Sequence, residues 1–314
     1  VAFPKNFNRL KDEEIANYEW LIDTTASFST QNKIATGKFP KSLNIGRCEL
    51  ADSGKLGLLY IEGKERNPRL DDLINLTYYL GTSSAVIEGW RKRDAEKELT
   101  TLNVGLGCSS TTTIMADDVV SFHASIFSKL FYRQNKRENL GNDGLICMSQ
   151  FDHDPFPRIS NETLLVKAFD CFECNAGSGW EVRMKAGIKD RVLSLCNAEG
   201  DIETGGVLIG MANYKTKTIH VFDILEKTED SYGTADEFTR GIKGLPEQVD
   251  LVKKKTGNVI GYIGEWHTHP MGFECLSRKD RRTIVILRGK NRKIPIPTCS
   301  IIVTKQDVIA YVFE

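Results

Sequence analysis

One stretch near the C-terminus decides most about this chain: EWHTHPMGFECLSRKD, at residues 265–280. It continues an apolar run, residues 259–266, that is typical of a buried strand. Residues i and i+2 of a strand face the same side, so His267 and His269 can direct both imidazoles at one point. A proline ends the strand, and Asp280 lies eleven residues beyond His269, at the start of an expected helix. Two imidazoles and one carboxylate, with a fourth position left open, are typical of a catalytic zinc site.

Such a site needs a base for the water that the metal binds. Zinc lowers the pKa of that water from about 16 to about 7, so a nearby carboxylate can take its proton. Glu203 is the candidate base, in the run IETGGVLIG at residues 202–210. Ser277 is placed to donate a hydrogen bond to the oxyanion that forms on the scissile carbonyl. A lone pair of histidines usually binds no metal, and the complete set of positions is what favours the zinc site.

These two runs, E-x-G-G-x-L-x-G and H-x-H-P-x-x-x-x-x-x-S-x-x-D, resemble the JAB/MPN family with an intact JAMM motif. Members with the full motif are isopeptidases or peptidases that act after the Gly-rich tail of ubiquitin or its relatives. The resemblance implies a mixed β-sheet flanked by helices, with the zinc site at a strand end. It also implies a role for each matching residue: His267, His269 and Asp280 bind zinc, Glu203 is the general acid/base, and Ser277 helps to hold the oxyanion.

The N-terminal half carries a second resemblance. The run LIDTTA at residues 21–26, then a helical stretch and a strand pair within 43–62, resembles the later part of the adenylating fold of ThiF and ubiquitin-activating enzymes. In that family an Asp at this strand end holds magnesium near ATP, which implies that role for Asp23. A loop before a long helix can carry a thioester-forming Cys there. Cys108, before the amphipathic helix expected at 111–133, is thus the candidate acceptor for a ubiquitin-like tail.

This half departs from the family in one respect. The Gly-rich nucleotide loop belongs upstream of Asp23, but only 22 residues precede it, without a G-x-G-x-x-G. The sequence is therefore a fragment, as its start at Val1 also indicates, or a partner completes the ATP site, or this half is a relic. The alternative for Asp23 is a strand-end cap. The alternative for Cys108 is a small buried residue in a Gly-rich turn.

Composition limits the partners and the compartment. The 314 residues favour two domains, and 42 basic against 42 acidic residues give a net charge of zero. A neutral chain has no footprint for nucleic acid or an anionic membrane, and no apolar run reaches the roughly 18 residues of a membrane span. No signal peptide is visible, and eight scattered Cys fit a reducing cytoplasm. We read the polar stretch 134–160 as loops that precede a domain boundary.

The sequence thus predicts an α/β chain with a ThiF-like region at 1–165 and a JAB/MPN domain at 166–314. The expected activity is zinc-dependent cleavage after a ubiquitin-like tail, in a bacterial modification system of the kind found in antiphage defence. Expected partners are the modifier, its conjugates, a ubiquitin-conjugating-like enzyme and a second copy bound through the first region. Three alternatives stay open: an ATP-dependent activating enzyme with a regulatory peptidase, a non-catalytic MPN scaffold, and a peptidase for a sulfur-carrier precursor.

Overall fold

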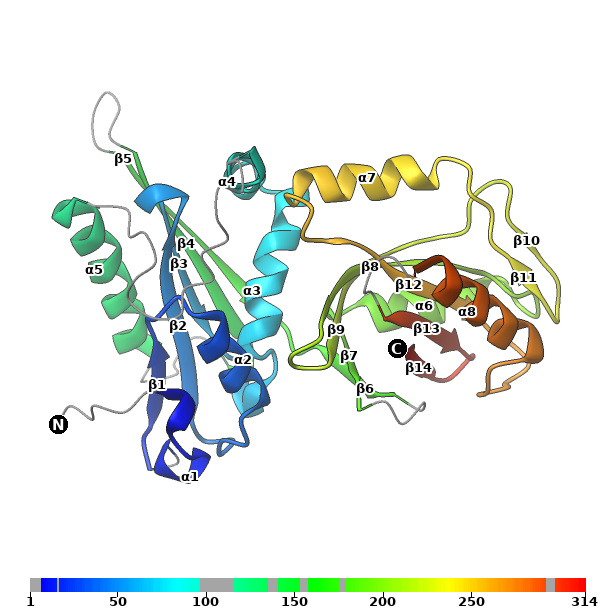
Figure 1. The fold of residues 1–314 in the computed structure, drawn as a ribbon, viewed down its shortest axis with the longest axis horizontal. Coiled ribbons are helices and arrows are strands. Elements are labelled where there is room, and N and C mark those ends of the chain that lie inside the picture. Colours follow the sequence, from blue (N-terminus) through cyan, green and yellow to red (C-terminus); the bar gives the residue numbers. More distant parts are fainter. Residues whose placement is uncertain are drawn as a thin grey trace. The chain divides into compact units, whose positions relative to one another are not determined.

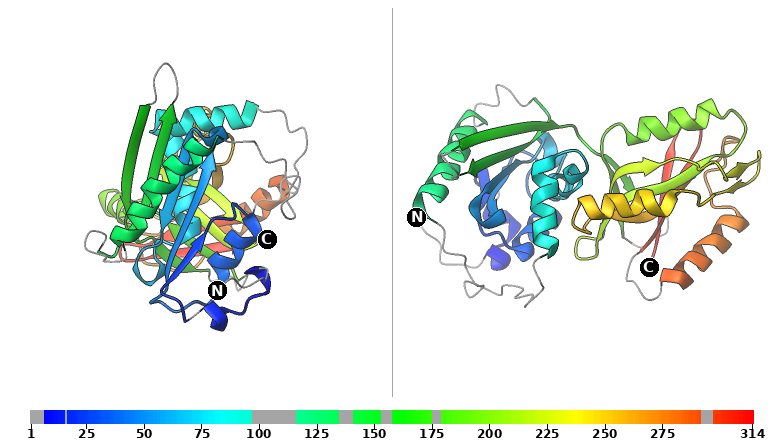
Figure 2. Two further views of the ribbon diagram at one scale, coloured as in Figure 1. Left: turned by 90° about the vertical axis from the view of Figure 1, so that its left-hand side faces the viewer. Right: turned by 90° about the horizontal axis from the view of Figure 1, so that it is seen from above.

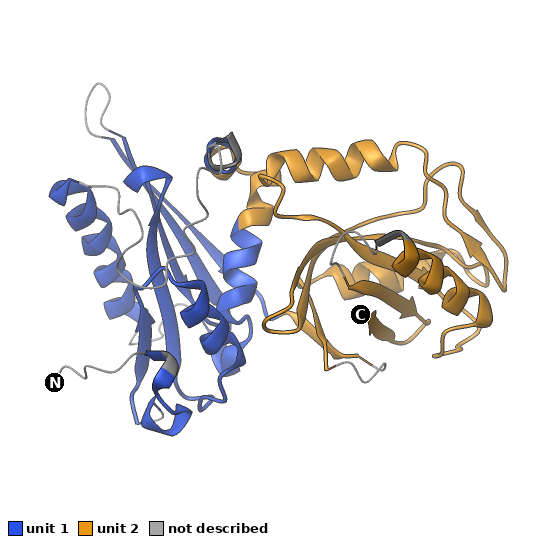
Figure 3. Ribbon diagram, in the orientation of Figure 1, with its two compact units in different colours: residues 1–77, 89–168 blue, residues 78–88, 169–314 orange. Residues whose placement is uncertain are grey.

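The chain forms two units, residues 1–77 with 89–168 and residues 78–88 with 169–314 (Figure 3). Each has its own sheet. No helix in the described part of the chain combines the length and apolar character that a bilayer crossing requires. Cys108 lies outside the described residues. The computed structural model describes residues 7–15, 17–96, 116–134, 141–152, 158–174, 179–291 and 297–314.

The first unit is built on a five-stranded sheet in the order β1-β2-β3-β4-β5 (Figure 1). β1 and β2 are parallel because α2 crosses between them, and the other neighbouring strands are antiparallel. The strands are β1 (Trp20–Asp23), β2 (Asn44–Ala51), β3 (Leu56–Ile61), β4 (Gly144–Asp152) and β5 (Arg158–Val166). The helices are α1 (Asp12–Ile15), α2 (Phe28–Thr36), α3 (Leu70–Tyr79), α4 (Ala85–Glu96) and α5 (Asp117–Gln134), with short 3-10 turns at Phe7–Arg9, Asp52–Gly54, Lys64–Arg66 and Leu80–Thr82.

Local signals place these elements. Ser27 caps α2, because its Oγ accepts the Thr30 N–H at 3.4 Å. The strand pair predicted within 43–62 is confirmed as the hairpin of β2 and β3, which turns at Asp52–Gly54. Figure 2 shows α5 on one face of this sheet and α3 on the other. Phe127 of α5 is buried in the cluster that this helix forms with β3 and β4.

The prediction of loops over residues 134–160 was wrong. β4 and the start of β5 lie there, and six consecutive residues of β4, from Gly144, are buried. A strand between two others, covered on both faces, reads as a short apolar run without alternation, so periodicity alone does not mark it. The run GLICM at 144–148 was therefore masked by the polar residues around it. The broad α/β class is confirmed, with several sheets and helices in the described residues.

The second unit is built on a seven-stranded sheet in the order β14-β13-β12-β8-β9-β7-β6. β12 is parallel to β13, β7 is parallel to β9, and the other neighbours are antiparallel. The strands are β6 (Asp170–Glu173), β7 (Glu181–Met184), β8 (Gly205–Asn213), β9 (Thr218–Leu225), β12 (Gly261–Thr268), β13 (Thr298–Val303) and β14 (Val308–Phe313). The helices are α6 (Ile188–Ala198), α7 (Leu245–Lys255) and α8 (Arg278–Asn291), and a small hairpin joins β10 (Tyr232–Gly233) to β11 (Phe238–Thr239).

The two faces of this sheet are covered differently. Trp266 of β12 is 1% exposed and lies in the main core, which α6 covers through Val192 and Cys196. On the opposite face α8 is attached through Ile284 to a small cluster with Ile302 of β13. Side chains alternate along β12, so the residues on either side of Trp266 face α8 rather than the main core.

Substituting Gly206 of β8 with Ala should destabilise the second unit. A Cβ at this position would lie 1.9 Å from the Leu225 carbonyl oxygen, so β8 and β9 would have to separate. Forcing atoms into a packed core costs up to about 3 kcal/mol of unfolding free energy. Gly289→Ala is the matched control, because a Cβ there meets nothing within 4 Å and Ala favours a helix. Chemical denaturation of both variants measures this, and an unchanged midpoint for Gly206→Ala would contradict it.

Candidate metal centre

β12 carries both histidines to one end of the sheet. His267 is the second-last residue of this strand, and His269 is the first residue after it. The His269 N–H donates to the Val303 carbonyl at 2.8 Å. The ends of β8 and β12 are cross-linked by Thr204 and Thr268. The Thr204 N–H donates to the Thr268 Oγ1 at 2.9 Å, and the Thr268 N–H donates to the Thr204 carbonyl at 2.8 Å. This link fixes the loop before β8 beside the two imidazoles.

The first turn of α8 supplies Asp280 to the same place. The Ser277 N–H donates to Asp280 Oδ2 at 2.7 Å, and the Asp280 N–H donates to Ser277 Oγ at 3.2 Å. This reciprocal pair resembles a capping box, in which two otherwise unpaired helix N–H groups are satisfied together. Ser277 therefore orients the Asp280 carboxylate through its backbone, a contact that the sequence did not suggest.

Side-chain donor atoms of three residues converge. The Nε2 atoms of His267 and His269 are 3.1 Å apart, Asp280 Oδ1 lies 3.2 Å from His267 Nε2, and Asp280 Oδ2 lies 3.5 Å from His269 Nε2. Ligand atoms around a tetrahedral zinc, about 2.0–2.1 Å from the metal, lie about 3.3–3.4 Å from one another. The observed separations match this spacing. These residues could therefore hold a metal ion.

The orientation of His269 also suits a ligand. Its Nδ1 lies 2.8 Å from the Phe273 carbonyl oxygen, which can only accept, so we assign the proton to Nδ1. The lone pair of Nε2 then points at the convergence point, as second-sphere contacts of ligating histidines usually arrange. Burial alone raises the pKa of the Asp280 carboxyl, but its hydrogen bonds with His267 and His269 outweigh this and lower that pKa. The carboxylate is thus kept ionised.

Glu203 lies beside these three residues. Its Oε1 is 4.0 Å from His269 Nε2, and the residue is 9% exposed. Its N–H donates to the Thr234 carbonyl at 2.7 Å, so the β10–β11 hairpin holds its backbone. Burial raises the pKa of the Glu203 carboxyl, against the opposing effect of His267 and His269. A carboxyl with a raised pKa is better suited to exchange protons near neutral pH.

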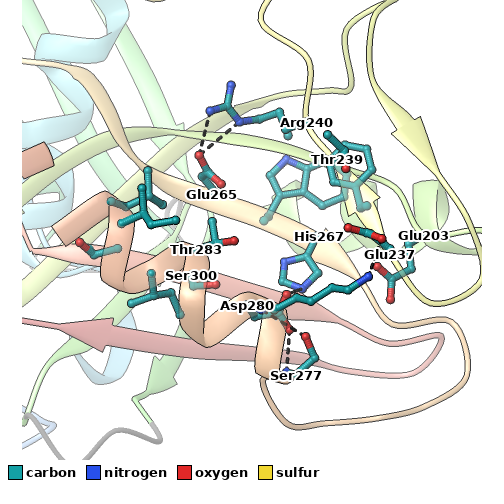
Figure 4. A pocket seen from close by; sticks show the side chains of 18 of the residues that line it. Glu203, Glu237, Thr239, Arg240, Glu265, His267, Ser277, Asp280, Thr283 and Ser300 are labelled. Atoms are coloured by element: carbon teal, nitrogen blue, oxygen red, sulfur yellow. Dashed lines mark hydrogen bonds and ion pairs between the residues drawn. The ribbon is translucent and has the colours of Figure 1, made fainter. Parts of the chain in front are cut away.

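A pocket of about 340 Å³ borders this centre and is lined by His267, Asp280 and Glu203 (Figure 4). Its floor is formed by β12 and β13, and its walls by α8 and by the β10–β11 hairpin. The hairpin was not predicted, because its strands have two residues each and carry no readable alternation. Its Phe238 ring lies against Gly205, where a Cβ would meet the ring at 2.8 Å, so the hairpin packs closely on the start of β8, two residues after Glu203.

Asp23 lies elsewhere, at the end of β1, and is 3% exposed. Its Oδ2 accepts from Arg47 Nη1 at 2.6 Å, and its Oδ1 accepts from the N–H and hydroxyl of Thr25 at 2.9 and 2.7 Å. Both carboxylate oxygens thus have protein partners, and these contacts stabilise the end of β1. The magnesium–ATP role of Asp23 stays a prediction, as does the thioester role of Cys108, which lies outside the described residues.

Asp23→Ala should lower the unfolding free energy of the first unit by about 3 kcal/mol, because it leaves Arg47 buried without one of its carboxylates. Glu49, 2.6 Å from Arg47 Nη2, limits the loss. Asp143→Ala is the control, since Asp143 pairs with a Lys167 that is 74% exposed, and such pairs contribute at most about 1 kcal/mol. Equal denaturation midpoints for the two variants would show that the Asp23–Arg47 pair adds nothing.

Comparison with known proteins adds one relative. Over 115 residues the chain is 31% identical to a protein named CD-NTase/cGAS isopeptidase from Enterobacter hormaechei subsp. hoffmannii (strain UCI 50). The chain is similar in part to an isopeptidase. The match covers 37% of this chain and 62% of the relative, so the chain spans less than two thirds of that protein's length.

Two further comparisons add less. No protein-family profile matches the chain. A solution structure of a protein from Desulfitobacterium hafniense aligns with 40% of this chain and 79% of its own, at 16% identity. Its TM-score of 0.29 is too low to support any argument.

Proposed function

We propose that this chain is a zinc-dependent isopeptidase that hydrolyses the amide bond after the C-terminal tail of a ubiquitin-like protein. One observation carries the proposal: the Nε2 atoms of His267 and His269 are 3.1 Å apart, and each lies within 3.5 Å of an oxygen of the Asp280 carboxylate, with the Glu203 carboxylate beside them. Two imidazoles and a carboxylate form the ligand set of catalytic rather than structural zinc sites. The name of the curated relative supports isopeptidase chemistry.

His267, His269 and Asp280 would hold the metal. Zinc, when bound, supplies a Lewis acid that polarises the scissile carbonyl and lowers the pKa of a water. Glu203 takes a proton from the attacking water at its carboxylate and returns it to the leaving amine. Ser277, exposed at the rim of the pocket, donates its hydroxyl to the developing oxyanion. The Phe238 ring, which packs on Gly205 and lines the pocket, would leave room beside Glu203 for the small residues of a Gly-rich tail.

The setting is part of the same proposal. The resemblance of the first region to activating enzymes supports a ubiquitin-like modification system in a bacterial cytoplasm. In that system the peptidase matures the modifier or removes it from its targets. The name of the relative, CD-NTase/cGAS isopeptidase, supports a link to a CD-NTase or cGAS-like protein.

The test is cleavage of a defined isopeptide. An internally quenched substrate, Leu-Arg-Gly-Gly joined to a lysine side chain, is incubated with the full chain and zinc. We expect cleavage after the second Gly, loss of cleavage with 1,10-phenanthroline, and recovery when zinc is restored. Linear fusions of ubiquitin-like proteins encoded beside this chain form a second substrate set. If no substrate is cut and elemental analysis finds no bound zinc, the non-catalytic scaffold replaces this proposal.

A further inference from the structure

The pocket has a second set of polar side chains away from the metal centre, which we call the polar end (Figure 4). Its members come from four elements or their flanking loops, and each lines the same pocket. The proposed reaction uses none of them. They are Arg240, Glu265, Thr283, Thr298 and Ser300.

Glu265 is the charged group at the centre of the polar end. Its Oε1 accepts from Arg240 Nε and Nη2 at 3.2 and 3.0 Å, and from the Tyr262 hydroxyl at 3.3 Å. Among the described residues, these contacts all involve Oε1, and none involves Oε2. The side chain is 19% exposed, and it lines the pocket. One carboxylate oxygen is therefore held in place while the other remains available to a ligand.

Thr298 gives an independent sign of a ligand. It is 4% exposed, and its Oγ1 is buried without a hydrogen-bond partner in the described part of the chain. Buried polar atoms nearly always have partners, so such an orphan needs an explanation. Thr298 and Ser300 are two apart on β13 and share a face, and Ser300 pairs with Glu265 in the sheet register. The orphaned hydroxyl and the available carboxylate oxygen therefore belong to one side of the sheet and one pocket.

The groups at the polar end favour a ligand that donates hydrogen bonds. A carboxylate only accepts hydrogen bonds, and hydroxyls can accept them as well. Arg240 is already committed, since its Nε and Nη2 contact Glu265 and its Nη1 donates to the Gly241 carbonyl at 3.2 Å. A group that brings several N–H donors and a positive charge would satisfy the polar end. The side chain of Arg or Lys is the ligand that fits.

The spacing along β12 indicates which residue of the substrate would carry this basic side chain. Glu265 precedes His267 by two residues on the same face, which is about 6.6–6.8 Å along a strand. An extended peptide advances by the same amount in two residues. A tail whose last residue lies at the metal centre and which runs along β12 thus places its third residue from the cleaved bond at Glu265.

We propose that the polar end is a specificity site that selects a basic side chain at the third residue from the cleaved bond of the modifier's tail. Glu265 binds this side chain through Oε2, Thr298 and Ser300 accept further N–H groups, and Arg240 positions Glu265. This inference rests on the proposed function. It adds the charge and position of a residue that the metal centre does not specify.

Three isopeptides test this inference, Leu-Xaa-Gly-Gly on a lysine side chain with Xaa as Arg, Ala or Glu. The readout is the ratio of kcat/KM for the Arg tail to kcat/KM for the Ala tail. A variant that lowers activity on every tail by the same factor leaves this ratio unchanged. A hydrogen-bonded charge pair between Glu265 and the Arg of the tail predicts a ratio of about ten or more for the unmodified protein. The Glu tail should be cut more slowly than the Ala tail. Glu265→Gln should bring the ratio close to one. Arg240→Gln should lower the ratio less than Glu265→Gln does, because the carboxylate remains and the Tyr262 hydroxyl still holds its Oε1.

Glu237→Gln is the matched control. Glu237 is an acidic residue of the same pocket, but it pairs with Lys279 instead of lining the polar end, so its loss should leave the ratio in place. Equal rates for the Arg and Ala tails in the unmodified protein would overturn the inference. A ratio that falls equally in Glu237→Gln and Glu265→Gln would also do so, because only overall pocket charge would then matter.

Failure of the inference differs from failure of the proposed function. Cleavage of all three tails at equal rates leaves the isopeptidase proposal standing and removes only the specificity site. Calorimetric binding of the free peptides Leu-Arg-Gly-Gly and Leu-Ala-Gly-Gly gives a readout that needs no turnover, and equal affinities would contradict the inference again. A protein that neither binds zinc nor cuts any tail loses both proposals together.

Discussion

Glu203→Gln should lower kcat for the isopeptide by about a thousandfold, because general acid–base catalysis by a positioned side chain contributes roughly 10²–10⁴. Gln has nearly the same shape as Glu, but its amide cannot accept the proton of the attacking water or return one to the leaving amine. The backbone contact to Thr234 involves the residue 203 N–H and survives the change. The loss should therefore appear in kcat more than in KM, and the fold should stay intact.

Zinc content separates this explanation from loss of the metal. Glu203 is not among the three residues whose donor atoms converge, so the variant should keep a full equivalent of zinc. Glu229→Gln is the control, since Glu229 is 81% exposed, pairs with Lys243 and does not line this pocket. Activity of Glu203→Gln within tenfold of the unmodified protein would remove Glu203 from the proposed mechanism. Loss of zinc along with activity would assign it to metal binding instead.

Asp280→Ala should abolish both zinc binding and cleavage. The change removes one of three donors and leaves two imidazoles whose Nε2 atoms are 3.1 Å apart without the carboxylate that balances them. We expect a zinc stoichiometry near zero after dialysis and a fall in kcat/KM of about a thousandfold or more, as losing the Lewis acid and the oriented water implies. Elemental analysis and the isopeptide assay measure the two effects on the same sample.

Folding must be followed as well, because Asp280 also accepts the Ser277 N–H at the start of α8. Loss of such a cap costs about 1 kcal/mol, which is too little to unfold the unit. Asp250→Ala is the control, because Asp250 lies on α7, is 74% exposed and is remote from the ligand set. An Asp280→Ala protein that folds, holds a full equivalent of zinc and cuts the isopeptide would contradict the proposed ligand set.

The sequence was informative where residues depend on near neighbours. The i, i+2 spacing of His267 and His269 required only a strand, and an apolar run predicted that strand correctly. Asp280 required a helix start, which the Ser277 cap provides within three residues. The candidate ligands could thus be named from local pattern alone.

Tertiary context decided the features that were missed. The contact of Glu203 with the β10–β11 hairpin joins residues 203 and 234, which no local pattern connects. The Arg240–Glu265 pair depends on how that hairpin packs over β12, although the two-residue offset of Glu265 from His267 was a usable signal. β4 was missed because burial on both faces removes the alternation that marks a strand, whereas β5 is an edge strand whose first six residues are exposed, so no apolar run marks its start.

The main-chain contact between Glu203 and Thr234 has a consequence for how such a protein can diverge. The same hairpin that forms one wall of the pocket also fixes the backbone of the proton-transfer residue, and Gly233 packs so closely that a Cβ would meet the Glu203 carbonyl oxygen at 2.1 Å. Grafting a hairpin from another protein to accept a new tail would therefore also move Glu203. Changes of specificity that spare the rate should arise instead at Glu265 and Thr298, which lie on the rigid sheet.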